Sequence, residues 1–292
     1  MGILLGGLFI VQKGVPILLP HELREQIISS ATFERQMAER GWTVTHVRKA
    51  YTDPAVFRQQ WLICPNGAGY PERTFYRAFG STLFRKLFRY MLSHVPCPRE
   101  TLEQICPQQD LLTSYLTFMQ DQEWFSSHGH SLHRGPYQAY ISNIGRTLEW
   151  YVAEWLRLTY SLTRLAPVYH GVQIAEMPLP GDLDVVAILG DQLLAVVECK
   201  SASDVDEAHF SLFLQRVQAL RPDIAILLID TPAPFPPERI TAFNAALRHL
   251  ELPSLTGNRG FYRGVYRIHI VNVEHSIATS LNDVLRSYFD HS

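Results

Sequence analysis

Cysteine is scarce in this chain of 292 residues, which has only four and no CxxC pair: Cys64, Cys97, Cys106 and Cys199. Their spacing and low density exclude the disulfide framework of a small secreted domain. We therefore expect a protein of a reducing compartment and place it in the cytoplasm.

The chain also lacks a long uninterrupted apolar run. Its opening segment, MGILLGGLFIVQKGVPILLP, has no basic n-region and no small-residue cleavage site, and Lys13 interrupts it after too few residues to span a bilayer. We expect neither a targeting peptide nor a membrane partner. What is present, 47% hydrophobic residues over 292 positions, is ample for real cores, and the length suggests two domains.

Charge is distributed unevenly along the chain. Residues 1–140 hold 14 Lys and Arg against 11 Asp and Glu, whereas residues 141–292 hold 12 against 17. A phosphate-binding surface in the acidic half would need a divalent cation to supply positive charge.

Hydrophobic periodicity predicts a regular order of elements after residue 140. A helix over 143–160 is followed by strands over 168–177, 182–189 and 193–199, a helix over 207–220 and a strand over 224–230. The Gly190-Asp191 pair is a hairpin turn signal. Further elements are expected over 237–250, 264–273 and 276–289. The predicted fold class is α/β, with an α-β-β-β-α-β core.

Charged side chains interrupt the two hairpin strands in PGDLDVVAILGDQLLAVVECKSA, residues 180–202. Alternation puts Glu198 and Lys200 on one strand face, about 6 to 7 Å apart, and the turn lays Asp184 close to Glu198. Two adjacent carboxylates repel, and a hard divalent cation, Mg²⁺ or Mn²⁺, is the usual reason to keep them. The ammonium of Lys200 can hold an attacking water or neutralise a phosphoryl oxygen. The alternative is an inert, exposed, ion-paired strand end.

This pattern resembles the PD-(D/E)xK nuclease superfamily, with Asp184 as the first acid and Glu198-Cys199-Lys200 as the (D/E)-x-K tripeptide. The stretches GDLDVVAI and AVVECK are similar to the resolvase-like and Mrr-like branches. The resemblance covers about residues 141–230 and implies a restriction-endonuclease-like αβββαβ core with a mixed sheet. It also implies metal ligation by Glu149, Asp184, Glu198 and the backbone carbonyl of Cys199, whose side chain packs in the opposite layer.

Three assignments at this site stay open. Glu149 and Glu154 are five residues apart, hence about 140° around a helix, so only one faces the sheet edge. We favour Glu149 and place Glu154 on the wetter face; the alternative is that both are solvated helix charges. Asp182 is either a ligand or a turn cap after Gly181. Gln215, on the helix after the tripeptide, is either a polar helper that contacts nucleic acid or a solvated side chain.

For residues 1–140 we predict an α-rich module. RETLEQICPQQDLLTSYLTFMQDQEWF predicts a short helix, a turn at Pro107 and a longer helix, and HGHSLHRGPY predicts a wing. The part from about 73 to 140 thus resembles a winged helix-turn-helix. Its second helix has acids but no Lys or Arg, which is poor for reading DNA and fits a protein-contacting or linking role equally well.

Basic and aromatic residues alternate over residues 73–90, RTFYRAFGSTLFRKLFRY. The aromatics could stack on bases while the basic residues clamp phosphates: Arg73, Arg77, Arg85, Lys86 and Arg89. The alternative is an amphipathic core helix with a solvated basic face. A zinc role for His128, His130 and His133 lacks a nearby cysteine pair.

From these observations we expect a Mg²⁺- or Mn²⁺-dependent phosphodiesterase, a nuclease and by preference an endonuclease, that acts on DNA in preference to RNA. Glu149, Asp184 and Glu198 would hold the metal, and Lys200 would orient the attacking water. The alternative is a catalytically silent nucleic-acid-binding or scaffold protein that keeps the fold. Association into a homodimer is left open.

Overall fold

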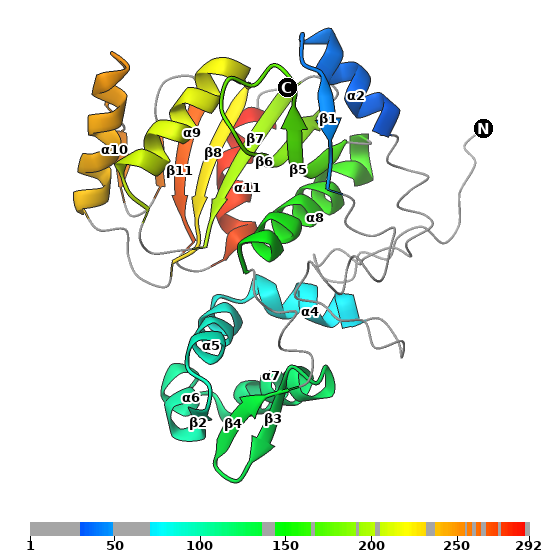
Figure 1. Cartoon of the computed structure of the whole chain (residues 1–292), viewed down its shortest axis with the longest axis vertical. Helices are drawn as coiled ribbons and strands as arrows, with labels where there is room; N and C mark the ends of the chain where they lie inside the picture. Colours follow the sequence, from blue (N-terminus) through cyan, green and yellow to red (C-terminus); the bar gives the residue numbers. More distant parts are fainter. Residues whose placement is uncertain are drawn as a thin grey trace.

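A mixed eight-stranded sheet with helices on both faces makes up most of the structure, so the chain is an α/β protein (Figure 1). The strand order is β1-β5-β6-β7-β8-β11-β10-β9. This computed structural model describes residues 30–48, 71–135, 144–164, 167–190, 193–201, 205–231, 237–254, 256–258, 261–263, 267–273 and 276–289.

The centre of the sheet consists of mostly aliphatic strands that are buried on both faces: β5 (Val168–Ile174), β6 (Leu183–Leu189), β7 (Leu193–Lys200), β8 (Ile224–Ile229) and β11 (Ile268–Asn272). Strands β5, β6 and β7 pair antiparallel, whereas β8 lies parallel to both β7 and β11. The β6–β7 hairpin closes with Leu189 opposite Leu193, as the turn signal at Gly190 predicts. The elements predicted over residues 143–230 are present in the predicted order.

Helices cover both faces of the sheet: α8 (Ile144–Arg164) and α11 (Ile277–Phe289) on one face, and α2 (Ser30–Glu39), α9 (Glu207–Leu220) and α10 (Pro237–His249) on the other. Successive residues of β7 show this division, because Val197 packs in the core cluster of α8 while Val196 packs in a cluster with α2. This period-2 alternation is what a strand dictates. None of the described helices is both long enough and apolar enough to cross a membrane.

The sheet edges include three short strands that the periodicity does not predict. Strand β1 (Val44–His46) pairs antiparallel with β5, and α2 packs on the same part of the sheet. The segment from α2 to Arg48 is therefore part of the sheet-containing region, although it precedes the predicted boundary at residue 140. At the opposite edge, β9 (Thr256–Asn258) and β10 (Phe261–Arg263) form an antiparallel pair that continues from β11.

The remaining elements lie below the large sheet in Figure 1: α4 (Pro71–Gly80), α5 (Thr82–Ser93), β2 (Cys97–Pro98), α6 (Arg99–Ile105), α7 (Gln109–Asp121), β3 (Phe125–His128) and β4 (Ser131–Arg134). The short helix, the longer helix and the hairpin expected here are present. The basic-aromatic stretch is two helices rather than one, because Ser81 caps α5 by accepting the N–H of Phe84 at 3.4 Å.

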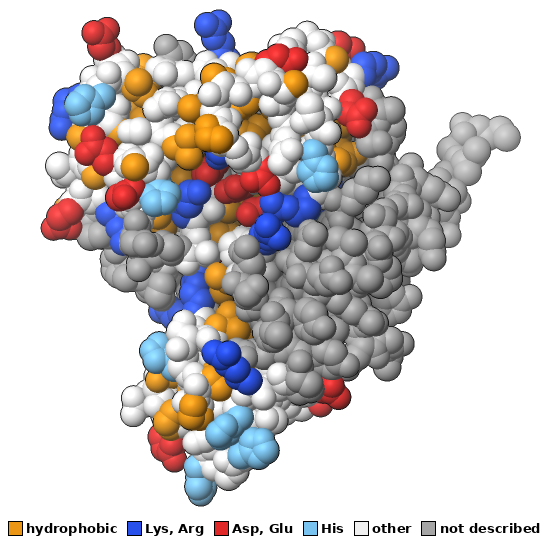
Figure 2. Space-filling model, viewed as in Figure 1, with side chains coloured by type: hydrophobic (Ala, Val, Ile, Leu, Met, Phe, Trp, Pro, Cys, Tyr) orange, Lys and Arg blue, Asp and Glu red, His pale blue; other side chains and the backbone are white. Residues whose placement is uncertain are grey.

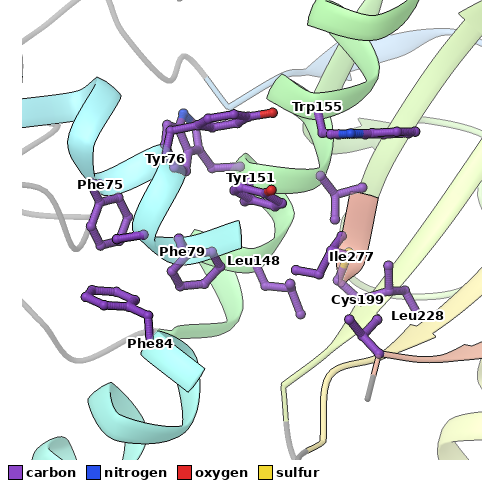
Figure 3. Packing of buried hydrophobic residues seen from close by; sticks show 14 of the residues in the cluster. Phe75, Tyr76, Phe79, Phe84, Leu148, Tyr151, Trp155, Cys199, Leu228 and Ile277 are labelled. Carbon is purple, nitrogen blue, oxygen red and sulfur yellow. The ribbon is translucent and has the colours of Figure 1, made fainter. Parts of the chain in front are cut away.

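An aromatic core joins these lower helices to the sheet. Figure 3 shows Tyr76 and Phe79 of α4 packed against Tyr151 of α8, while Phe75 contacts Phe79 and Trp150. The Tyr76 and Tyr151 rings are stacked with centroids 4.8 Å apart. A Cβ at Gly80 would lie 2.7 Å from the Tyr151 hydroxyl oxygen, so only glycine permits this close approach. The core therefore continues across the predicted domain boundary.

Candidate active site

Strands β6 and β7 bring Asp184 and Glu198 together at one end of the hairpin. The paired register ends at Val185 opposite Val197, so the next position along places Asp184 opposite Glu198. There the Asp184 carboxylate, and not a backbone carbonyl of β6, accepts the next hydrogen bond from β7: its Oδ2 accepts the N–H of Cys199 at 2.7 Å. The Cys199 side chain lies in the core on the other face, as the resemblance implies.

Two cations hold the buried carboxylate of Glu198. Lys200 donates from Nζ to Oε1 at 2.8 Å, and Arg216 of α9 donates from Nη1 to both oxygens, at 3.2 and 3.0 Å. Burial lowers the pKa of Lys200, but the charges of Glu198 and Asp184 outweigh burial, so the Lys200 pKa is raised. The lysine is therefore an ammonium at neutral pH.

Two other acids act on the carboxyl group of Asp184. Burial raises the pKa of Asp184 well above its ordinary value, and the charges of Glu198 and Glu149 raise it further. Lys200 and the Cys199 N–H act in the opposite direction. Glu149 therefore lies near enough to Asp184 to raise its pKa, and we call Glu149, Asp184 and Glu198 the acid cluster.

Arg48, which follows β1, forms ion pairs with both Glu149 and Asp182. Burial raises the pKa of Glu149 to about 7, against the opposing effect of Arg48. The Arg48 backbone N–H donates to the carbonyls of His170 and Gly171, each at 3.2 Å. Gly171 has φ +58°, and a Cβ there would lie 2.7 Å from Arg48 Cζ. Asp182 is thus an ion-pair partner in this structure, a role that neither reading of the sequence considered.

The expectation that Glu154 lies on the wetter face of α8 is wrong. Glu154 is only 1% exposed and forms an ion pair with Arg157, one helical turn further along. The spacing of the two glutamates correctly indicates that they face different directions, but both directions are covered by protein.

Arg216 is a site residue that the sequence analysis missed. The residue before it, Gln215, is exposed on α9, whereas the Arg216 side chain is buried. Arg216 also donates to the Pro180 carbonyl at 3.0 Å, and a Cβ at Gly181, which has φ +95°, would lie 2.9 Å from its Nη2. Helical spacing could have found it, since it lies three residues after the buried Phe213 on the inner face.

Most of the basic-aromatic stretch does not form a surface that could clamp phosphates and stack on bases. Arg85 has no exposed surface and pairs with Asp230, and Arg89 pairs with the same carboxylate, so Arg85 is excluded from contact with phosphate. The aromatics are buried as well and cannot stack on bases: Phe75, Phe79, Phe84 and Phe88. Arg77 is exposed and Lys86 is half-buried, while the Arg73 side chain lies outside the described part of the structure. The core-helix alternative is the better description of most of this stretch.

The three histidines lie on the β3–β4 hairpin and its turn, and Figure 2 shows histidine side chains at the lower tip of the molecule. Among the residues that the structure describes, no three or more His, Cys, Asp or Glu side chains are arranged as they stand to hold a metal ion. This finding applies to the acid cluster too. Its carboxylate oxygens are the donors that Mg²⁺ prefers, but the oxygens of Glu149 and Glu198 are engaged by arginine and lysine. The donor chemistry fits a divalent cation, while the observed ion pairs must adjust to admit one.

Comparisons with known proteins place the chain in no family. No family model matches it, and no curated protein matches it. Can2 from Sulfobacillus thermosulfidooxidans, solved in complex with cyclic tetra-adenylate, is 14% identical with a TM-score of 0.42, over 87% of this chain and 60% of that one. Protein VC1899 from Vibrio cholerae is 13% identical with a TM-score of 0.37, over 90% and 57%. The chain spans about three fifths of the length of these structures, and likeness at this level carries no argument about function.

Proposed function

We propose that this chain is a metal-dependent nuclease with a restriction-endonuclease-like core, which hydrolyses phosphodiester bonds in DNA in preference to RNA. The observation that carries the proposal is the placement of Asp184 opposite Glu198, with Lys200 on the same strand end. A structural ion pair between Glu198 and its cations does not require a second acid, Asp184, beside it, where burial and then the charges of Glu198 and Glu149 raise its pKa.

Each group at the strand end has a distinct task in this proposal. The carboxylates of Glu149, Asp184 and Glu198, with the Cys199 carbonyl, would hold Mg²⁺ or Mn²⁺, which polarises a phosphate and makes a bound water more acidic. The Lys200 ammonium orients the attacking water and offsets charge on a phosphoryl oxygen. Arg48 and Arg216 fix the positions of the acids from neighbouring elements.

A catalytically silent scaffold is the second candidate, and one observation favours it. Arg48 and Arg216 pair with Glu149 and Glu198, so these acids also satisfy the requirements of purely structural ion pairs. The module from α4 to β4 has the element types of a winged helix, and α7 presents no Lys or Arg, which favours a linking or protein-contacting role for it.

A cleavage assay with two variants separates the candidates. Wild-type protein should cut supercoiled or linear DNA with Mg²⁺ or Mn²⁺ and not with EDTA. Lys200→Ala should lower the cleavage rate about 10²- to 10³-fold while keeping a metal-dependent rise in melting temperature, because an ammonium is not a ligand. Asp184→Asn should lose both the cleavage and the rise.

The control for this assay is Asp223→Asn, which changes an acid at the other end of β8 and should keep cleavage and the metal-dependent rise. A wild-type protein that cleaves no DNA or RNA and shows no melting shift with either metal would establish the scaffold reading instead.

A further inference from the structure

Two arginines of α5 converge on one aspartate at the end of β8. Arg85 Nε lies 2.9 Å from Asp230 Oδ2, and Arg89 pairs with the same oxygen. The side chains of Arg85 and Asp230 are 0% and 1% exposed, so this ion pair is fully enclosed by protein. We call these three residues the Asp230 clamp.

The backbone of Asp230 contacts the proposed catalytic lysine. Lys200 and Ile229 are paired in the parallel β7–β8 register, and the N–H of Asp230 donates to the Lys200 carbonyl at 2.8 Å. Asp230 thus binds α5 through its side chain and β7 through its backbone. A shift of α5 relative to the sheet would act directly on the strand end that presents Lys200.

Arg85 is also held from the side of its own helix. Its Nη1 donates to the carbonyls of Phe79 and Gly80, at 2.7 and 3.0 Å, and its Nη2 donates to Thr82 Oγ1 at 3.2 Å. The carbonyls belong to the last residues of α4, which have no partner within that helix. Because this buried guanidinium has partners on both sides, its position is strongly determined.

The surroundings of the clamp make a stiff connection. Phe79 and Phe84 belong to the same core cluster as Leu148, Cys199 and Leu228, and Figure 3 shows Phe79 and Leu148 between Phe84 on one side and Cys199 and Leu228 on the other. Ser81, at the start of α5, forms a β-bridge with Ser276 before α11. Close-packed contacts of this kind transmit a displacement rather than absorb it.

We propose that Asp230 is a positioning residue for Lys200, and that α5, through Arg85 and Arg89, sets the place at which β7 presents the lysine. This inference rests on the proposed function, because it takes Lys200 to act in catalysis. A misplacement of about 1 Å caused far from the chemistry can cost about 10²-fold in rate. The helical module, which runs from α4 to β4, therefore contributes to the position of Lys200 and so to catalysis.

The test is Asp230→Asn, which keeps the shape of the side chain and removes its charge. The expected result is a fall in kcat of about 10- to 100-fold with KM and the metal requirement little changed, since neither depends on the lysine position. Asp223→Asn is the matched control: Asp223 lies just before β8, pairs with Arg40 at 3.2 Å and accepts the Leu194 N–H at 2.8 Å, but lies away from Lys200. Its kcat should equal that of the wild type.

A second variant covers the case in which Asp230→Asn fails to fold. Arg89→Gln leaves the Arg85–Asp230 pair in place, and we expect it to fold and to lose kcat several-fold with unchanged KM. A folded Asp230→Asn or Arg89→Gln protein with wild-type kcat would overturn the proposal.

Amide hydrogen exchange gives a readout that needs no activity. In Arg89→Gln, and in Asp230→Asn where it folds, exchange should rise together in α5 and at the ends of β7 and β8, while in Asp223→Asn these segments should match the wild type. A rise confined to α5 would overturn the coupling. If the wild type cleaves nothing, the proposed function fails, and exchange alone decides whether the clamp joins α5 to β7.

Discussion

At the residue scale, Glu149 carries a charge that folding disfavours. Burial raises its pKa from 4.5 to about 7, so the native state binds the proton more tightly than the unfolded state does. Protonation of Glu149 therefore adds to the free energy of unfolding. This contribution is fully present below about pH 4.5 and is lost as the pH rises through about 7. Glu149→Gln, which cannot release a proton, should remove up to about 3 kcal/mol of this pH dependence.

The measurement is the melting temperature in EDTA at several pH values from 4.5 to 8. Glu103→Gln changes an exposed acid that pairs with Arg99 on one face of α6, and should leave the pH dependence of the wild type unaltered. Equal slopes for Glu149→Gln and wild type would mean that Glu149 titrates in the native state as it does when unfolded. Asp184 contributes with the same sign in all three proteins.

The individual acids and the lysine of the site could be predicted from the sequence, but their partners could not. Alternation along a strand places Glu198 beside Lys200, and the hairpin turn places Asp184 opposite. Arg48 pairs with a glutamate 101 positions away, and nothing local in the sequence specifies that contact. Arg85 shows the same limit, because an arginine that is buried with an acid 145 positions away looks identical in sequence to a solvated one.

At the element scale, strand β5 makes room for Arg48 through a single glycine. Gly171→Ala combines a left-handed backbone with a Cβ 2.7 Å from Arg48 Cζ, and we expect it to cost about 2 to 4 kcal/mol of stability. Cleavage should fall as well, because Arg48 holds Glu149 and Asp182. Gly129→Ala separates the two effects: Gly129 has φ +61° with nothing within 4 Å of its Cβ, so only the backbone cost of about 1 kcal/mol should remain.

Denaturant titration and a cleavage assay on both glycine variants check this expectation. Equal losses of stability for Gly171→Ala and Gly129→Ala would contradict this expectation, because Arg48 would then move away from the new methyl group at no cost in free energy.

Elements in which apolar residues recur with a clear helix or strand period could be predicted from the sequence, whereas elements of only three residues could not. The helix predicted over 207–220 is α9 at the same bounds, because apolar residues recur at helical spacing and Asp206 caps its start. Strand β1 has three residues with mostly exposed side chains, so it carries no period of its own and exists because β5 offers an unpaired edge. The spacing of the aromatics in α4 and α5 fits a surface that stacks on bases and a buried core face equally well, and the structure has them in the core with α8.

At the scale of the whole molecule, the sheet and the helical module share one core. A fragment of residues 141–292 would lose β1, Arg48 and both arginines of the Asp230 clamp, and would expose the face of α8 that packs on α4. We expect it to unfold at a lower denaturant concentration than the full chain, to associate, and to cleave poorly. A fragment of residues 71–292 keeps the clamp and loses β1, so its midpoint should lie between the two.

Chemical denaturation and size-exclusion chromatography of the three proteins check this order. A fragment of residues 141–292 with the midpoint of the full chain would show that the predicted boundary separates two independent domains.

Cys199 gives this molecule a built-in chemical reporter. Cys199 stands between Glu198 and Lys200 in the sequence, and its thiol is buried in the core. Burial raises the pKa of this thiol well above the ordinary value, so the native protein presents almost no thiolate to an alkylating reagent. Labelling at this position requires the strand end to leave the core. The rate at which Cys199 is alkylated therefore reports how often the end of β7 opens, and no cysteine has to be introduced for the measurement.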